Sequence, residues 1–298
     1  MRAEFVAITS GGALIGGGGV VIERRAGQHW IHALPWLLPG APWAAPGAAA
    51  EVDRAFAGAL AARACELRAA GGTWAAYRPD DPVDRAALEP VGGETRRVEA
   101  ALIELGEGVE PAWRRIERRG RQELDRARRD GLRFAEEPEA LEAAVALHRA
   151  QSRGWPGHRP LPIELSRRLL APGSGAPAAR LFTVRDSRGL LAATLALIHP
   201  REVMAWWSGT HPDGRRRHAF AFLLWSLAEW AAARGAARLN LGASAGREGV
   251  ILFKRALGAV GHPYPVRWLD DRHAPPLGRL AAGLQRLQWR GRDRGERA

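Results

Sequence analysis

Three observations predict a protein that mixes α-helices and β-strands around a mixed sheet. The chain has 298 residues and is 46% hydrophobic, which is enough to bury more than one core. Its second half alternates two helices, three strands, a helix, a strand, a helix and a strand, and several helices end at a glycine. Such an alternation is typical of a sheet with helices on both faces, so we predict the α/β class (α+β with a mixed sheet).

The first 108 residues predict a smaller, loop-rich unit. Short apolar runs indicate strands at residues 5–9, 20–23, 29–33, 73–78 and 98–105. Helical periodicity indicates one helix at residues 55–70, which ends before two glycines. The run Gly16–Gly19 lacks the following Gly-Lys-Ser/Thr of a phosphate loop, so we predict a flexible turn there.

Residues 109–270 are predicted to form the main domain, after a boundary at Gly106–Gly108. The predicted helices span residues 111–129, 138–151, 163–170, 219–234 and 249–257. The predicted strands span residues 132–135, 181–186, 190–198, 202–209, 238–241 and 265–269. A tight turn at residues 187–189 predicts a hairpin between the second and third of these strands.

Residues 271–298 form a basic tail. From Arg272 to Ala298 there are seven arginines and two acids, a net charge of +5. Apolar residues recur at nearly helical spacing beside three arginines: Leu277, Leu280, Leu284, Leu287 and Trp289, with Arg279, Arg286 and Arg290. Such a helix could lie on an anionic membrane. We expect instead that the stripe packs on the main domain, because amphipathic helices more often face a core.

Composition indicates which class of partner the protein binds and in which compartment we expect it. A net charge of +12 and a pI near 11.3 favour an anionic partner, namely nucleic acid, a nucleotide-bearing substrate or a membrane surface. The single cysteine, Cys65, excludes an internal disulfide and a multi-cysteine metal site, and we expect its thiol to be buried. No metal is predicted. No secretion signal and no run of about 18 apolar residues occurs, so we expect a cytoplasmic protein without a transmembrane segment.

Lys254 is the only lysine and Asn240 the only asparagine of the chain. A lysine that persists among so many arginines indicates chemistry that needs a compact ammonium. Asn240 lies near the end of a predicted strand, and Gly242 begins the loop to the helix that carries Lys254. A strand end, a small-residue loop and the next helix are a usual place for a site in an α/β sheet. The structural alternatives are a surface lysine and an asparagine that caps the loop.

Four short motifs occur in the order found in one known superfamily. They are Arg121 to Ala127 followed by Gly131, Leu223-Leu224-Trp225 with Gly235, Asn240-Leu241-Gly242, and Phe253-Lys254-Arg255 with Gly258. Together with the order of elements, they resemble the FemABX-like branch of the GNAT superfamily, which contains peptidyltransferases that use aminoacyl-tRNA and related acetyltransferases. The resemblance covers residues 109–269. It implies a degenerate GNAT-like half in residues 1–108.

The resemblance implies a bacterial N-acyltransferase that moves an acyl or aminoacyl group to an amine. The donor would be an acyl-CoA or an aminoacyl-tRNA, and one alternative is a tRNA-dependent peptidyltransferase acting on a cell-wall precursor. Residues 215–220 read RRRHAF where acetyl-CoA enzymes carry a glycine-containing phosphate loop, which disfavours CoA. An alternative of another class is a non-catalytic basic module that binds nucleic acid or an anionic membrane.

The candidate catalytic residues are Lys254 and Asn240. Lys254 would stabilise the oxyanion that develops during acyl transfer or the anionic end of a substrate, and Asn240 would orient an amide or carbonyl. The candidate substrate-binding residues are Arg121, Arg126, Trp207, Ser208 and Phe253. Arginine forks suit phosphate or carboxylate, and of the neighbours Trp206 and Trp207 one should face a cleft and the other the core. We expect Lys254 to line a cleft, so that its replacement removes activity and leaves stability nearly unchanged.

Overall fold

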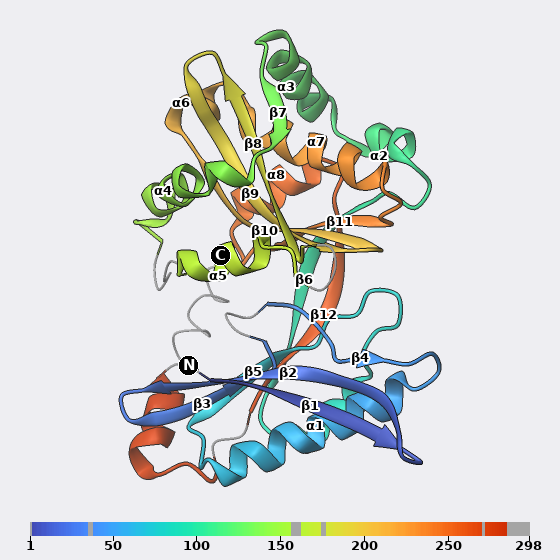
Figure 1. The fold of residues 1–298 in the computed structure, drawn as a ribbon, viewed down its shortest axis with the longest axis vertical. Helices are drawn as coiled ribbons and strands as arrows, with labels where there is room; N and C mark the ends of the chain where they lie inside the picture. The colour runs from blue at the N-terminus through green and yellow to red at the C-terminus, as the bar shows by residue number, and fades with distance from the viewer. Residues whose placement is uncertain (1, 35–37, 156–161, 174–176, 270–271, 285–298) are drawn as a thin grey trace. The chain divides into compact units, whose positions relative to one another are not determined.

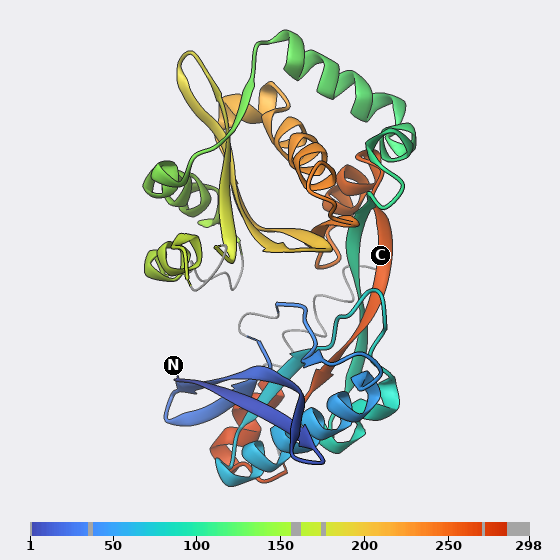
Figure 2. The same cartoon turned by 45° about the vertical axis from the view of Figure 1, so that its right-hand side comes forward.

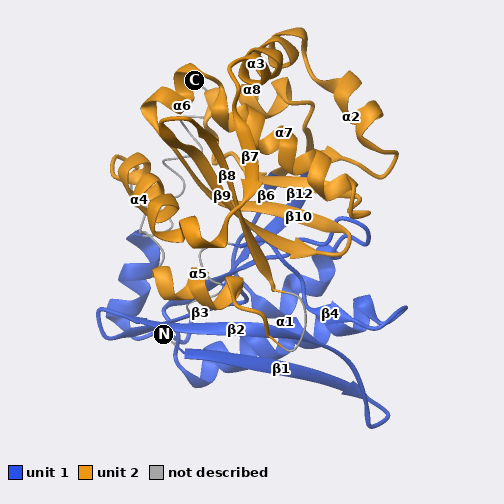
Figure 3. Cartoon of the chain, turned by 45° about the horizontal axis from the view of Figure 1, so that its top comes forward, with its two compact units in different colours: residues 1–99, 262–298 blue, residues 100–261 orange. Residues whose placement is uncertain are grey.

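A computed structural model describes residues 2–34, 38–155, 162–173, 177–269 and 272–284. The chain forms two compact units, and Figure 3 colours unit 1 (residues 1–99 and 262–298) and unit 2 (residues 100–261) differently. The predicted mixed α/β fold class is confirmed. The borders between the units fall inside the strands at residues 95–104 and 260–268. The expected borders were after residues 108 and 270. The second border differs because the chain after residue 261 pairs with a strand of unit 1.

Unit 1 is a mixed sheet with a long helix against it. The strand order is β1-β2-β3-β5-β12, with the short β4 paired to β2, and only β3 and β5 run parallel. The elements are β1 (Arg2–Ser10), β2 (Ala13–Arg25), β3 (Gln28–His32), β4 (Trp43–Ala44), α1 (Ala49–Glu66), β5 (Gly71–Ala75), the 3-10 helix η2 (Arg85–Val91) and β12 (Val260–Trp268).

The glycines of β2 let α1 lie close to the sheet. A Cβ atom at Gly16 would lie 2.5 Å from Val52 Cγ2, and one at Gly18 would lie 2.8 Å from Phe56 Cε2. Gly16–Gly19 therefore belongs to a strand on which a helix packs, and the prediction of a flexible turn is wrong. The expected burial of Cys65 on α1 is also wrong, since its side chain is exposed.

His32 is a buried histidine of unit 1. It is 6% exposed, and its Nδ1 lies 2.8 Å from the Thr73 hydroxyl oxygen. Burial lowers the pKa of His32 to about 4, and the charge of Arg25 acts in the same direction while Glu23 opposes it. Between this pKa and the ordinary 6.5, the unfolded chain holds a proton that the folded chain lacks. Stability is therefore lost as the pH falls through this window.

We expect the free energy of unfolding to fall by about 1–3 kcal/mol between pH 7 and pH 4 on account of His32 alone. Urea unfolding of the wild type and of His32→Asn at a series of pH values measures this, because asparagine keeps a donor for Thr73 and has no charge to gain. His273→Gln, at an exposed position, is the matched control. Parallel pH dependences for the wild type and His32→Asn would contradict the assignment.

Unit 2 contains a further run of mixed strands with its own helices, labelled in Figure 1. Its strand order is β6-β11-β10-β9-β8-β7, in which only β10 and β11 run parallel. The strands are β6 (Thr95–Glu104), β7 (Arg133–Glu136), β8 (Ala179–Asp186), β9 (Gly189–His199), β10 (Glu202–Thr210) and β11 (Arg238–Ala243). The helices are α2 (Val109–Arg115), α3 (Arg118–Arg129), the 3-10 helix η3 (Pro138–Ala140), α4 (Leu141–Ser152), α5 (Ile163–Leu170), α6 (Pro212–Arg216), α7 (Ala219–Ala232) and α8 (Glu248–Ala256).

Helices cover both faces of this sheet, as Figure 2 shows for α4 and α5 on one side and α7 on the other. Each face of the sheet has its own hydrophobic core, and successive residues of β9 point alternately into one and the other. Ala192 and Ala196 pack in the core with α2, α3 and α7. Ala193 and Leu195 pack in the core with α4. The predicted helix at residues 163–170 and the hairpin around residues 187–189 are confirmed.

The predicted helix at residues 111–129 is two helices. The chain turns extended at Ile116 and Glu117, and the Glu117 amide donates to the Ala256 carbonyl at the end of α8 at 3.1 Å. Gly120 lies against the same carbonyl, since a Cβ atom there would come within 2.4 Å of it. The break is thus made by contact with α8, which local sequence does not encode.

The tail packs differently from the expectation. Residues 276–284 are helical, but Leu277, Leu280 and Leu284 are exposed, and the opposite side of the helix contacts unit 1 through Ala282. The three leucines of the stripe that lie in the described residues are therefore exposed, where packing on the main domain was expected. Leu287, Trp289, Arg286 and Arg290 lie outside the described residues.

Candidate active site

The parallel strands β10 and β11 pair along only part of their length. Their register runs from Glu202 opposite Arg238 to Met204 opposite Asn240 and stops there, while β10 continues to Thr210. A register shift on the β9 side, between Ala205 and Trp207, marks a bulge in β10 just after this point. Beyond this point β10 and β11 no longer exchange backbone hydrogen bonds, so backbone groups of the two strands are left for other partners.

Asn240 fixes the end of β11, where its pairing with β10 stops. Its side chain is fully buried, and its Nδ2 donates to Glu202 Oε1 at 2.8 Å while its Oδ1 accepts the Gly242 amide at 2.7 Å. Glu202 also faces Arg238, with 3.8 Å between the carboxylate and Nη1. Asn240 therefore caps the turn after the strand and couples that turn to β10.

Lys254 reaches the same turn from α8. Its Nζ donates to the Gly242 carbonyl at 2.8 Å and to the Ala243 carbonyl at 3.1 Å, and the residue is only 7% exposed. The structure brings Lys254 and Asn240 together through Gly242. Because the side chain is buried and hydrogen-bonded, the structure predicts that its replacement lowers stability, in place of the nearly unchanged stability expected for a residue that lines a cleft.

Burial lowers the pKa of Lys254 from 10.5 to about 8. The amine is thus mostly protonated at neutral pH and loses its charge in the mildly basic range. An ammonium has three N–H groups, and two of them are used on the carbonyls of β11. The third makes no hydrogen bond to the described residues, so it can serve a substrate oxygen.

Phe253 and the start of α7 lie on the same side of the sheet. The Phe253 ring stacks on Phe220, with centroids 5.6 Å apart and an interplanar angle of 11°. Just before α7, His218 has a left-handed backbone with φ of 56°, the conformation that a glycine of a phosphate loop would supply. The amides of Ala219, Phe220 and Ala221 make no hydrogen bond to the described residues. The first turn of α7 can therefore receive a phosphate without the glycines.

Trp207 packs against α4, whereas the Ser208 side chain lies on the other face of the sheet, beside Thr194, and neither residue forms a hydrogen bond with Lys254. Trp207 is 7% exposed with its ring centroid 5.3 Å from that of His148, and the Ser208 hydroxyl donates to Thr194 Oγ1 at 2.9 Å. Trp206 and Trp207 both pack in the core that α4 and α5 cover, because the bulge interrupts the alternation of β10. The expectation that one of them faces a cleft and the other the core is wrong.

His148, a residue that the sequence did not single out, holds the far end of β10. Its Nδ1 donates to the Ser208 carbonyl at 2.8 Å, so this nitrogen carries the proton of the neutral ring. Burial lowers the pKa of His148, which favours the neutral form. From the same helix, Gln151 Oε1 accepts the Thr210 amide at 2.8 Å. Only the fold brings α4 to this strand, so helical periodicity alone could not reveal the contact.

Arg121 and Arg126 lie on α3, apart from the Lys254 network. Arg121 is partly exposed and Arg126 is exposed. The same helix carries the exposed Arg118 and Arg129, and none of these four guanidinium groups forms an ion pair or a hydrogen bond with the described residues. They form an uncompensated basic face on α3.

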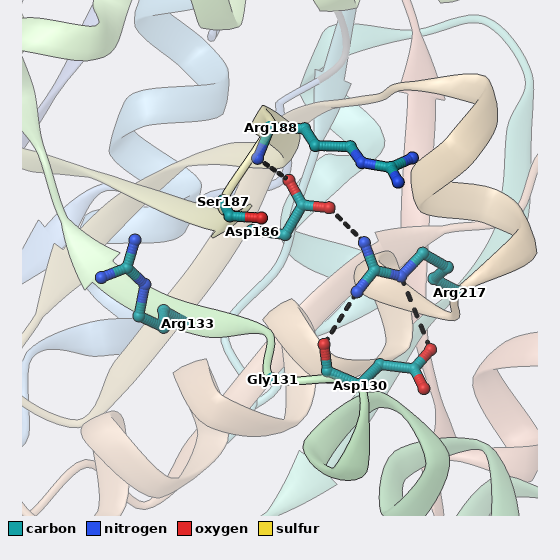
Figure 4. A pocket seen from close by; sticks show the side chains of 7 residues that line it. All are labelled: Asp130, Gly131, Arg133, Asp186, Ser187, Arg188 and Arg217. Carbon is teal, nitrogen blue, oxygen red and sulfur yellow. Dashed lines mark hydrogen bonds and ion pairs between the residues drawn. The ribbon is translucent and has the colours of Figure 1, made fainter.

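A cavity of about 620 Å³, shown in Figure 4, lies between the end of α3, the β8–β9 turn and the loop before α7. Arg217 forms ion pairs with the carboxylates of Asp186 and Asp130, the second with 3.5 Å between Nε and Oδ2. Its Nη2 also donates to the Asp130 backbone carbonyl at 2.8 Å. The amide of Arg188 donates to Asp186 at 2.8 Å, and this bond, followed by the Arg217 guanidinium, holds the pKa of Asp186 below its ordinary value. The charge of Arg217 is thus used within the fold. The remaining lining residues are Gly131, Arg133 and Ser187.

Within the described part of the chain, no group of three histidine, cysteine, aspartate or glutamate side chains is placed to hold a metal ion. None of the described helices is long and apolar enough to cross a membrane.

The geometry agrees with a comparison of the sequence with known families. Residues 113–255 match the family model of the acetyltransferase (GNAT) domain, a span that contains Asn240 and Lys254. Unit 2 is therefore a GNAT-type acyltransferase domain, and the resemblance inferred from the four motifs is confirmed. Domains of this family use acyl-CoA as donor. No curated protein matches the sequence.

Solved structures extend the likeness to nearly the whole chain. FemX is similar with a TM-score of 0.68 at 12% identity, over 94% of this chain and 90% of that chain. A conserved protein of unknown function from Bacteroides thetaiotaomicron gives 0.58 at 14% identity, over 90% and 86%. The C-terminal domain (DUF2156) assigned to a lysylphosphatidylglycerol synthetase from Agrobacterium fabrum gives 0.55 at 15%, over 90% and 85%. The fold of the chain is thus of the FemX type.

Proposed function

We propose that this chain transfers an acyl or aminoacyl group from a carrier to an amine acceptor, at the point where β10 and β11 separate. One observation carries the proposal: Lys254, buried beside this point, holds the two carbonyls that end β11 and keeps one N–H for a further acceptor. The family match to an acetyltransferase domain over the same residues supports it.

The chemistry follows from this placement. The amine attacks the carbonyl carbon of the donor, a tetrahedral oxyanion develops, and the bond to the sulfur or oxygen of the carrier breaks, while the proton that the amine loses ends on that departing sulfur or oxygen. A cation in a site of low dielectric stabilises that oxyanion more than the uncharged carbonyl, which lowers the barrier. Asn240 does not contact the substrate in this proposal. It keeps the Gly242 turn in place and so positions Lys254.

An acyl-CoA is the first candidate donor. The family match favours it, and the first turn of α7 offers free amides beside the left-handed His218. The positive end of the helix dipole also favours a phosphate there. Phe220 and Phe253, which stack between this turn and Lys254, would flank the route from the phosphates to the reacting carbonyl.

An aminoacyl-tRNA is the second candidate donor, and the basic face of α3 favours it. Four exposed or partly exposed arginines without acidic partners suit a phosphate backbone better than a single nucleotide. A cell-wall precursor is one acceptor class compatible with this donor.

The test is an acyl-transfer assay with each donor and a panel of amines. Turnover that disappears in Lys254→Ala supports the proposal, and the donor that is consumed decides between the candidates. For tRNA, replacing Arg118, Arg121, Arg126 and Arg129 by glutamine should weaken binding and flatten its salt dependence. Arg168→Gln, at an exposed arginine of α5, is the control. Binding of RNA without turnover of either donor would favour a non-catalytic basic module.

Turnover is expected to decline as the pH rises through about 8, because Lys254 then loses the proton that makes it a cation. The contribution of Lys254 to stability changes with pH in the opposite direction to turnover. Between pH 8 and 10.5 the unfolded chain binds the proton more strongly than the folded chain, so the Lys254 contribution stabilises the fold as the pH rises. Activity and unfolding measured over the same pH range therefore separate the two effects. A flat rate profile from pH 7 to about 9.5 would contradict a charged role for Lys254.

A further inference from the structure

The helix at residues 276–284 is fixed to unit 1 by its small residues. Ala282 is buried with Trp30 and Ala70, and Ala281 packs beside them. Gly278 lies so close to the same surface that a Cβ atom there would meet Gln28 Oε1 at 2.8 Å and Ala70 Cβ at 3.3 Å. Small side chains on this side allow a close contact, which fixes the side of the helix that faces away.

That outward side carries three leucines. Leu277, Leu280 and Leu284 are 72%, 62% and 56% exposed. Their spacing of three and four residues places them on one side of the helix over consecutive turns. Leucines on the surface of a water-soluble unit are individually ordinary, but an aligned set on a docked helix is an apolar face without a partner among the described residues.

The positive charge of the chain favours an anionic bilayer over a second copy of the chain as the partner of this face. The chain carries +12, and the segment from Arg272 to Ala298 alone carries +5. The helix itself adds an exposed Arg279. A second copy of the chain would bring the same positive charge to the contact and be repelled. An anionic bilayer offers both an apolar interior for the leucines and negative headgroups for the arginines.

We propose that the leucine face of residues 276–284, assisted by the exposed Arg279, docks this chain on anionic membrane surfaces. The helix lies in the plane of the interface, with its leucines toward the acyl chains and its small-residue side on unit 1. This interaction is independent of the acyl-transfer reaction proposed above, because none of its residues belongs to the Lys254 network.

Cosedimentation of the full chain with vesicles tests the proposal. One set of vesicles is phosphatidylcholine alone, and the other contains roughly one third phosphatidylglycerol, which supplies the negative surface potential. The wild type is expected to bind the anionic set, more weakly at high salt, and not the neutral set. Serine at all three leucine positions is expected to reduce binding about tenfold or more without lowering the thermal midpoint, because these side chains are exposed.

Leu14→Ser is the matched control, since Leu14 is also in unit 1 and is 56% exposed. It should bind as the wild type does. Equal binding of the wild type and the triple variant overturns the proposal, and so does a wild type that binds neither vesicle set. A wild-type dimer that the three serines dissociate, without vesicle binding, also overturns it and assigns the face to self-association. Acyl transfer to a soluble acceptor should not change in the triple variant.

Discussion

Lys254→Ala is expected to abolish acyl transfer and to lower the free energy of unfolding by about 1–3 kcal/mol. The loss of activity follows from removal of the cation beside the separated strands. The loss of stability follows because the carbonyls of Gly242 and Ala243 lose their donor and α8 loses its tie to β11. Steady-state turnover and urea unfolding of the same preparation measure both effects.

Two further variants separate the charge from the packing. Lys254→Met keeps most of the aliphatic chain and removes a buried charge, so it should recover part of the stability and none of the activity. Lys254→Arg keeps the charge but should also fail, because a planar guanidinium does not fit the place of a compact ammonium between two carbonyls. Full turnover in either the alanine or the methionine variant would remove Lys254 from the proposed chemistry.

Gly209→Ala is expected to cost about 3 kcal/mol of stability and to disturb the end of β10. A Cβ atom at this position would lie 2.5 Å from the His148 amide nitrogen and 2.8 Å from the Leu147 carbonyl carbon. These are backbone atoms of α4, so the helix has to move away from the strand. The hydrogen bond from His148 to Ser208 would then lengthen.

Gly249→Ala is the matched control for this substitution. Gly249 lies in α8 with nothing within 4 Å of its added Cβ atom. Because alanine favours a helix over glycine, stability should stay equal or rise by up to about 1 kcal/mol. Thermal or urea unfolding distinguishes the variants. If Gly209→Ala were as stable as the wild type, α4 would not contact β10 as closely as the structure shows.

The course of the chain through unit 2 could be predicted well because its signals are local. Helix α5 matches its predicted span, and the β8–β9 hairpin follows from the short turn at residues 187–189. Periodicity of apolar residues, together with a glycine after a helix, depends only on neighbours in sequence. The resemblance to the GNAT superfamily rested on four such local motifs.

The wrong predictions concern segments whose conformation depends on contacts with residues distant in sequence. Gly16–Gly19 forms part of a strand because α1 packs on it, and the helix breaks at Ile116 because Glu117 bonds to α8. The bulge after Ala205 turns two adjacent tryptophans to the same face. None of these contacts leaves a pattern in the local sequence.

The candidate site was predicted in part. Lys254 and Asn240 stood out because each is the only residue of its kind, and the structure joins them through Gly242. Their burial, and the use of two lysine N–H groups on backbone carbonyls, could not be read from composition. His148 was missed for the same reason, since its partner Ser208 is 60 residues away.

The division of unit 1 between the two ends of the sequence bears on how the protein is made. Strand β5 pairs with β12 at Ala75 and Val266, so roughly 190 residues leave the ribosome between the two partners. At bacterial or eukaryotic speeds of synthesis, this interval is on the order of 10–40 s. During it, all of residues 100–261 emerge and the strands β6 to β11 can pair with one another, while one hydrogen-bonding edge of β5 stays uncovered. The nascent chain therefore carries a temporary open edge that another strand, or a chaperone, can reach before its proper partner exists.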